Sequence, residues 1–204
     1  MRQELNTFTE KLHRLQGQRD LLNKQLVESN IHKANFQRVY EDTLKARAIV
    51  QNVASETQKQ IEYHISNLVT MALASVFPDP WEFKLRFVQR RNKTEADLIF
   101  IKRGNEVDDI LDNGGGGVAD VASMALRFAL WSIKKSRATM ILDESTKFLH
   151  NISYQEKTSD LLKEVSEKLR IQIIMVSDQK AILKAADKVI EIINVDGEAK
   201  VLEE

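Results

Sequence analysis

The chain has 204 residues, and its 30 Lys and Arg residues are balanced by 30 Asp and Glu residues. This balance excludes a global electrostatic attraction to nucleic acid, so DNA binding would need a local basic patch. The absence of cysteine excludes a disulfide framework and a thiolate metal site. The sequence has no apolar stretch of about 18 residues, and its first residues, Met1-Arg2-Gln3-Glu4, are too polar for a signal peptide. We therefore expect a cytoplasmic protein without a membrane segment.

A heptad repeat predicts a coiled-coil helix over residues 1–76. Its apolar positions are Leu5, Phe8, Leu12, Leu15, Leu22, Leu26, Phe36, Tyr40, Val50, Ala54, Ile61, Leu68 and Met71. Polar residues such as Arg19, Lys33 and His64 also fall on this seam, where they weaken a dimer core and often set register or partner. A fully helical segment would be about 110 Å long at ~1.5 Å per residue. A single helix cannot bury its own row of apolar heptad residues. We therefore expect a coiled-coil partner helix, from another copy or from another protein.

After Pro78 and Pro80 the pattern changes, and residues 77–204 predict an α/β domain with a mainly parallel sheet. Two alternating segments predict a β-hairpin at the start of this domain, with Asn92 between its strands. The strands are expected at 81–91, 93–103, 139–142, 171–176, 188–194 and 200–202, with a turn at Asp196-Gly197 before the last. The helices are expected at 118–134, 154–169 and 179–186.

The segment Thr139-Met140-Ile141-Leu142 predicts a buried strand that ends in two acids, Asp143 and Glu144. The C-terminal ends of strands are where open α/β sheets bind ligands. Two adjacent acids there suit a nucleotide hydrolase, in which Asp143 would hold Mg²⁺ through water and Glu144 would deprotonate the attacking water. The simpler alternative is a strand that ends in an acidic turn.

Four consecutive glycines, Gly114, Gly115, Gly116 and Gly117, directly precede the predicted helix at 118–134. Backbone amides without side chains at a helix N-terminus can bind the phosphates of ATP. The alternative is a flexible linker. It is weakened because the following residues are small and apolar, so the glycines are anchored to a core. Neither a GxxxxGK[ST] loop nor a GxGxxG motif occurs in the chain.

The order of these parts resembles the C-terminal lobe of the ABC-type ATPase head of SMC-type proteins. It looks closest to the double-strand-break repair branch, which includes the large subunit of the bacterial SbcC/SbcD nuclease. The resemblance implies that Asp143 is the Walker B metal acid and that Glu144 is the catalytic base. It also implies that Gly114 to Gly117, followed by Val118, stand where the signature motif binds the γ-phosphate held by the opposite head.

The chain departs from the family pattern at several positions. Gly115 replaces the signature serine, Val118 replaces the signature glutamate, and His150 stands where the D-loop has aspartate. Asp178 stands near the position at which the family has its switch histidine. We expect Asp178 to cap the following helix instead. The phosphate-loop lobe, which in this family precedes the coiled coil, is also missing from the sequence. The chain is therefore expected to bind ATP only with a lobe supplied by a partner or by a missing segment.

A basic cluster lies on the predicted hairpin and includes Lys84, Arg86, Arg90, Arg91 and Lys93, followed by Lys102 and Arg103. It could contact DNA phosphates. Edge strands also commonly carry Lys and Arg as protection against aggregation, and Glu82, Glu95 and Asp97 dilute the charge. The histidines show no paired spacing for a metal site.

Three functional hypotheses follow. The first is half of an ATPase for DNA repair, recombination or chromosome maintenance, with an N-terminal lobe or second ATPase head, DNA and a possible nuclease subunit as partners. The second is a catalytically weak regulatory or decoy module that binds a partner ATPase through the coiled coil. The altered signature, D-loop and switch positions favour the second hypothesis, whereas the Asp143-Glu144 pair favours the first. A coiled-coil scaffold with an inert cap leaves the glycines unexplained.

Overall fold

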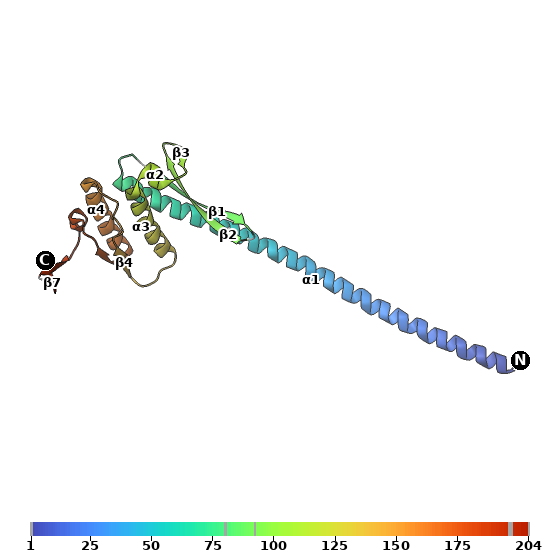
Figure 1. The fold of residues 1–204 in the computed structure, drawn as a ribbon. Coiled ribbons are helices and arrows are strands. Elements are labelled where there is room, and N and C mark those ends of the chain that lie inside the picture. Colours follow the sequence, from blue (N-terminus) through green and yellow to red (C-terminus); the bar gives the residue numbers. More distant parts are fainter. Residues whose placement is uncertain (1, 80, 92, 196–197, 204) are drawn as a thin grey trace. The chain divides into compact units, whose positions relative to one another are not determined.

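A computed structural model describes residues 2–79, 81–91, 93–195 and 198–203 (Figure 1). The chain divides into two units, residues 1–57 and residues 58–204. Helix α1 (Arg2–Val76) forms the described part of the first unit and the beginning of the second. Up to Thr57 its apolar heptad residues are exposed, among them Leu5, Phe8 and Val50. This exposure is what a coiled-coil seam without its partner helix would have.

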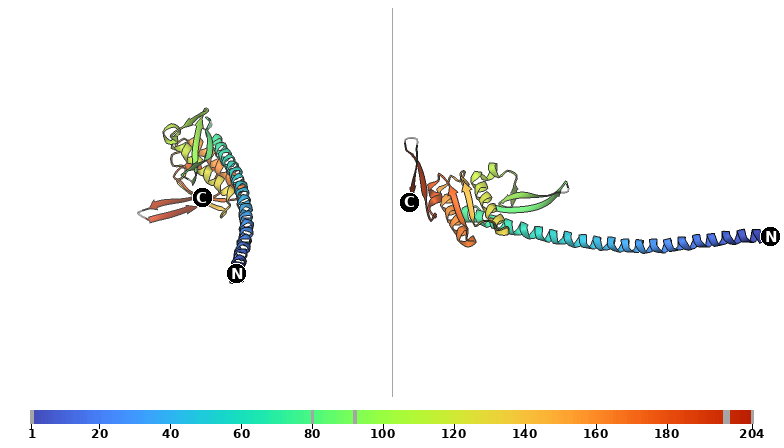
Figure 2. Two further views of the ribbon diagram at one scale, coloured as in Figure 1. Left: turned by 90° about the vertical axis from the view of Figure 1, so that its right-hand side faces the viewer. Right: turned by 90° about the horizontal axis from the view of Figure 1, so that it is seen from below.

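The second unit begins with an antiparallel sheet in the order β1-β2-β3. Strands β1 (Trp81–Arg90) and β2 (Lys93–Lys102) form the predicted hairpin, and β3 (Asn105–Val107) adds a short third strand. The hairpin runs beside the last turns of α1, as both views in Figure 2 show. Phe83 and Trp81 turn inward to join Leu73, Val69 and Val76 of the helix in one apolar core.

Helix α3 (Gly116–Ile133) is central to this unit because it contributes to two cores. Val118, Val121 and Ala125 belong to the core shared with α1 and the hairpin. Met124 and Phe128 belong to a second core with Leu142 of the following strand. A helix this rich in small and apolar residues can be covered on more than one side, as its composition predicted.

The parallel pairing predicted for the domain is found in β4 (Thr139–Asp143) and β5 (Gln172–Val176), which α4 (Ile152–Leu169) connects. A 3-10 helix, η1 (Lys180–Leu183), follows β5. Strands β6 (Ile190–Val195) and β7 (Glu198–Glu203) pair antiparallel in a ribbon of their own. The fold class is thus the expected one, an α/β domain with an initial hairpin behind a long helix, although parallel pairing in the described residues is confined to β4 and β5.

Two elements were not predicted from the sequence, the short strand β3 and α2 (Ile110–Gly114). The Asp109 carboxylate caps α2 by accepting the Leu111 amide at 2.8 Å. The predicted turn residues Asn92 and Asp196-Gly197 lie outside the described residues. Among the helices that are described, none is both long and apolar enough to cross a bilayer.

Candidate nucleotide site

The two acids lie at the C-terminal end of β4, where the sequence predicted them. Both Asp143 and Glu144 are exposed. Glu144 extends the ladder by one bond, since its amide donates to the Val176 carbonyl at 2.9 Å. Its φ of 42° is left-handed, which is uncommon for a residue other than glycine, and it turns the chain sharply out of the strand. Asp143 and Glu144 are thus consecutive at the C-terminal edge of the sheet, where α/β proteins bind ligands.

The face of β4 and β5 that carries Asp143 is apolar and uncovered. Its neighbouring side chains are Ile141, Ile174 and Val176, which are 70%, 46% and 56% exposed. The opposite face packs on α3 and α4 through Leu142, Met140 and Ile173. Parallel strands are normally buried on both faces. The uncovered face, defined by Ile141, Ile174 and Val176, is therefore more exposed than the faces of parallel strands usually are, and Asp143 lies on it.

The glycine tract is packed, and an added Cβ at three of its four residues would come within 3.0 Å of a neighbouring side chain, most severely at Gly116. A Cβ on Gly116 would lie 2.5 Å from the Cβ of Phe148, and one on Gly117 would lie 2.9 Å from Cδ1 of Leu149. A Cβ on Gly114 would lie 2.8 Å from Cδ1 of Ile110. These contacts contradict the flexible-linker alternative, because the tract is in close contact with the loop that follows the acids.

Gly115 differs from its neighbours. It precedes α3 as its N-cap residue with φ 76° and ψ 161°, a conformation that essentially only glycine adopts. A Cβ there would meet nothing within 4 Å, and the residue is exposed. The packing of the other glycines and the backbone of Gly115 together form an accessible turn at the start of an 18-residue helix, whose N-terminal amides favour an anion.

The loop from Glu144 to His150, which we call the acid loop, is held by residues that the sequence did not indicate as site residues. Gln179, which follows β5, donates from Nε2 to the Thr146 carbonyl at 2.9 Å and accepts the Thr146 hydroxyl at 3.2 Å. Thr146 is fully buried. Gln155 of α4 donates to the Leu149 carbonyl at 2.6 Å. Gln179 could not be identified from the sequence, because Thr146 lies 33 residues away.

Asp120 of α3 is a further residue that the sequence did not indicate. Its Oδ2 accepts the Phe148 amide at 2.8 Å. Partial burial raises the pKa of the Asp120 carboxyl, while the bond from the Phe148 amide and the nearby His150 lower it. The available indication was a carboxylate within a helix whose only other charged residue is Arg127, since such a group needs a partner.

Glu144 also has an ion-pair partner on its own loop. Nζ of Lys147 lies 3.3 Å from its Oε2, and both side chains are well exposed. Exposed pairs of this kind are worth about 0–1 kcal/mol. The Glu144 carboxylate is thus held only weakly and can be released to another partner.

Two of the expected departures from the family pattern can be located. His150 is exposed at the end of the acid loop. The expectation that Asp178 caps the next helix is wrong, because the N-cap of η1 is Gln179 and no side chain bonds there. The local bond is made by the Ser177 hydroxyl, which accepts the Gln179 amide at 3.1 Å.

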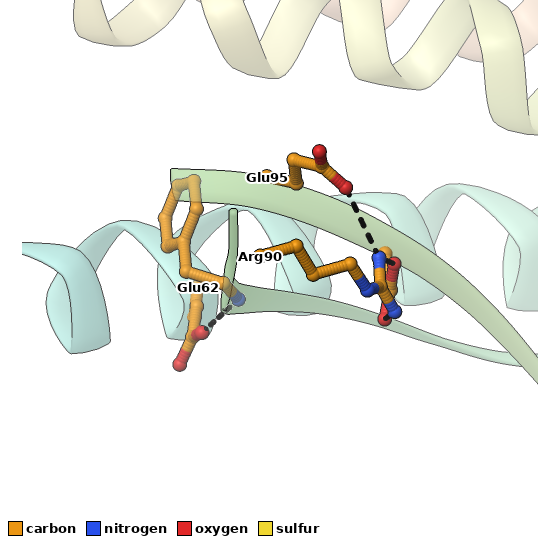
Figure 3. Close-up of polar contacts among 5 residues, drawn as sticks. Glu62, Arg90 and Glu95 are labelled. Carbon is orange, nitrogen blue, oxygen red and sulfur yellow. Dashed lines mark hydrogen bonds and ion pairs between the residues drawn. The ribbon is translucent and has the colours of Figure 1, made fainter. Parts of the chain in front are cut away.

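The basic cluster lies on the hairpin, but acids accompany it. Arg90 forms a bidentate pair with Asp97 at 2.7 and 2.8 Å and a longer contact with Glu95 (Figure 3). This pair raises the pKa of Arg90 and lowers that of Asp97. Arg86 pairs with Glu106 at 3.6 Å.

The remaining pairs involve Asp79, which lies 3.8 Å from Lys102 and 3.1 Å from Arg103. No ion pair is found for Lys84, Arg91 or Lys93 within the residues that the structure describes. Because its arginines are largely neutralised by neighbouring acids, the hairpin carries less free positive charge than its composition suggested.

The donor set fits Mg²⁺-ATP only in part. Mg²⁺ keeps several waters and binds through one or two carboxylates plus substrate phosphates, and Asp143 supplies one exposed carboxylate. No cluster of three or more metal-ligating side chains exists among the described residues. The phosphates would therefore have to be held largely by another lobe.

Neither a protein-family model nor a curated protein sequence matches the chain significantly. Among solved structures, it is similar to one from work on ATP-driven dimerization and DNA-stimulated activation of SMC ATPases, with a TM-score of 0.57 and 22% identity over 75% of this chain and 88% of the other. It is also similar to an Smc head domain with a coiled coil and joint from Pyrococcus yayanosii, with a TM-score of 0.61 and 20% identity over 84% of this chain and 32% of the other.

A third similar structure is the Smc head domain with an extended coiled coil bound to the C-terminal domain of ScpA from Pyrococcus furiosus. The TM-score is 0.55 and the identity 19%, over 91% of this chain and 48% of the other. The chain spans most of the first structure but less than half of the other two. It therefore has the fold of part of an SMC-type ATPase head together with a length of its coiled coil.

Proposed function

We propose that this chain is the C-terminal half of an SMC-type ATPase head that hydrolyses ATP only with a phosphate-loop lobe bound to it. The observation that carries the proposal is the uncovered face of β4 and β5. Asp143 shares this face with Ile141, Ile174 and Val176, which are the most exposed apolar residues of the two strands. A lobe that buried this apolar surface would bring its nucleotide to the acid pair.

Each residue of the site would then have its own role in ATP hydrolysis. Asp143 would hold Mg²⁺ through water, and Glu144 would orient and deprotonate the attacking water. The amides at Gly115 to Gly117 would bind the phosphates of a nucleotide held by a second head. The metal ion would neutralise the charge that develops on the transferred phosphoryl group.

The biological role that we propose is chromosome maintenance or DNA repair and recombination. SMC head domains of similar structure have been solved bound to ScpA domains, and we extend this to a protein partner of the same kind for this chain. DNA and a nuclease subunit are further proposed partners. The DNA contact would use Lys84, Arg91 and Lys93, the basic residues of the hairpin that are left without an ion pair among described residues.

A second candidate is a regulatory module that binds a partner ATPase through α1 without efficient hydrolysis. The altered positions favour it, because Gly115 stands where the signature has serine and His150 where the D-loop has aspartate, so neither contact to a nucleotide would be made in the family manner. The two candidates differ in turnover and in the surface that binds the partner, which is the face of β4 and β5 for the first and α1 for the second.

The test is calorimetry with Mg²⁺-ATP on the chain alone, on a phosphate-loop lobe alone, and on their mixture. Binding and turnover that appear only in the mixture would support a split head. Ile141→Glu should abolish association of the lobe while leaving the chain as stable as before, because Ile141 is exposed in the chain. Glu167→Gln, on the exposed surface of α4, is the matched control. Tight ATP binding by the chain alone would contradict the proposal.

A further inference from the structure

Asp120 connects the two halves of the candidate site. It lies one turn into α3, directly after the glycine tract, and its carboxylate bonds a backbone amide of the acid loop 28 residues later. A carboxylate that accepts a backbone amide forms a charge-assisted bond, which is shorter and stronger than a neutral one. The bond therefore holds the peptide between Lys147 and Phe148 at a defined place beside the helix.

This peptide is the far end of the turn that begins at Glu144. The Lys147 amide donates to the Glu144 carbonyl at 3.2 Å, and the Leu149 amide donates to the Thr146 carbonyl at 2.9 Å. The loop is therefore a compact series of turns. Because these bonds link its two ends, a displacement of the Phe148 backbone would also displace Glu144. The near end is held by the bond from the Glu144 amide to Val176. Asp120 holds the other end together with Gln155 and Gln179, which bond the Leu149 and Thr146 carbonyls.

The packing of the glycines makes the connection to α3 stiff. Gly116 and Gly117 lie against Phe148 and Leu149, and a carbon atom added at Gly116 would lie 2.5 Å from the Phe148 Cβ. The glycine contacts limit how closely the loop can approach α3, and the Asp120 bond opposes its separation from the helix.

We propose that Asp120 is a positioning residue for Glu144, which fixes the acid loop against the glycine helix so that the carboxylate is presented at the end of β4. This inference rests on the proposed ATPase function for its catalytic part. Asp120 itself touches neither nucleotide nor water in the reaction. Its removal should therefore lower the rate of the chemical step and leave nucleotide affinity almost unchanged.

The first experiment concerns the chain alone and does not depend on ATP. Hydrogen exchange of the Phe148 amide should be on the order of tenfold faster in Asp120→Ala, because its acceptor is gone, while exchange in β5 stays the same. Asp120→Asn keeps an acceptor oxygen and should restore most of the protection. Equal exchange of the Phe148 amide in the wild type and in Asp120→Ala would overturn the inference.

The second experiment measures ATP turnover by the chain together with a phosphate-loop lobe. Asp120→Ala should lower kcat on the order of tenfold to a hundredfold, since small misplacements of a catalytic group have effects of that size. KM should change less than about twofold, and Asp120→Asn should recover most of the activity. Asp160→Asn, an exposed acid of α4, is the matched control.

The two experiments separate the possible failures. Faster exchange together with normal kcat in Asp120→Ala would overturn the role in positioning Glu144 and leave the ATPase proposal intact. A rise in KM with unchanged kcat would also overturn it. No turnover by the wild-type mixture would instead refute the ATPase proposal, and with it the catalytic part of the inference, whereas the exchange experiment would still decide whether Asp120 holds the loop.

Discussion

The hydroxyl of Thr70 bonds the backbone of Phe83 twice, accepting its amide at 2.9 Å and donating to its carbonyl at 3.2 Å. One turn earlier on α1, the Ser66 hydroxyl accepts the Leu85 amide at 2.9 Å, and the Glu62 carboxylate accepts the Phe87 amide (Figure 3). Four residues of helix rise about 6 Å and two residues of strand about 6.6 Å. This match allows the helix to satisfy every second amide of an edge strand.

Replacing Thr70 by Val should destabilise the second unit by about 1–3 kcal/mol. The shape of the side chain is kept, but the backbone amide and carbonyl of Phe83 lose their partner in a partly buried place. The midpoint of urea unfolding checks this. Thr43→Val is the matched control, because Thr43 bonds only the Val39 carbonyl of its own exposed helix and should cost less than about 0.5 kcal/mol. Equal effects of the two substitutions would contradict the role assigned to Thr70.

Gly116→Ala should lower stability by about 1–3 kcal/mol, since the new carbon would overlap Phe148 at a position near the backbone. Gly17→Ala should instead raise the stability of the protein. Gly17 lies within exposed helix with nothing within 4 Å of an added carbon, so alanine should stabilise the helix by about 1 kcal/mol. Thermal unfolding followed by far-ultraviolet circular dichroism measures the change in stability of each variant. A neutral Gly116→Ala would mean that the glycine tract is not closely packed.

Glu144→Gln should slow ATP hydrolysis by the chain and a phosphate-loop lobe by roughly 10²–10⁴-fold, the usual contribution of a general base. Nucleotide binding should persist, because glutamine keeps the size of the side chain and removes only its basicity. Single-turnover kinetics with labelled ATP distinguish trapped nucleotide from lost binding. Hydrolysis at the wild-type rate would exclude Glu144 as the base.

Charge reversal at Arg91 and Lys93 should weaken DNA binding and reduce its dependence on salt. Each phosphate contact contributes a slope of about 0.9 in log K against log salt, so the double variant should lose about two units of slope. Arg90→Glu should have a smaller direct effect on the slope, because Arg90 is already paired with Asp97 and Glu95. Fluorescence anisotropy at several salt concentrations gives the slopes. An unchanged slope in the double variant would exclude the hairpin tip from the DNA contact.

Asp120 also predicts a dependence of stability on pH. Burial raises its folded-state pKa above the ordinary value of 3.8, so the folded state binds its proton more tightly than the unfolded state. The stabilisation linked to this proton is complete below about pH 4 and is lost as the pH rises through the folded-state pKa. The Asp120→Asn variant does not titrate there, so its stability relative to the wild type should improve between pH 4 and pH 7. A constant difference across this range would contradict the raised pKa.

Local patterns determined several features of this protein. The heptad spacing and the lack of proline determined the helix that ends at Val76, and the alternation after Pro80 determined the hairpin. The apolar run before Asp143 determined the strand that carries the acid pair. Each of these depends on the periodicity of neighbouring residues, which sequence records directly.

Only the tertiary structure decided which contacts these elements make. The bond from Asp120 to Phe148 joins residues 28 apart, and the bonds between Thr146 and Gln179 join residues 33 apart. The glycine tract suggested a phosphate site from its composition, yet Gly116 and Gly117 also lie close against Phe148 and Leu149. Close packing between distant segments leaves no period in the sequence, so it becomes visible only when the chain is folded.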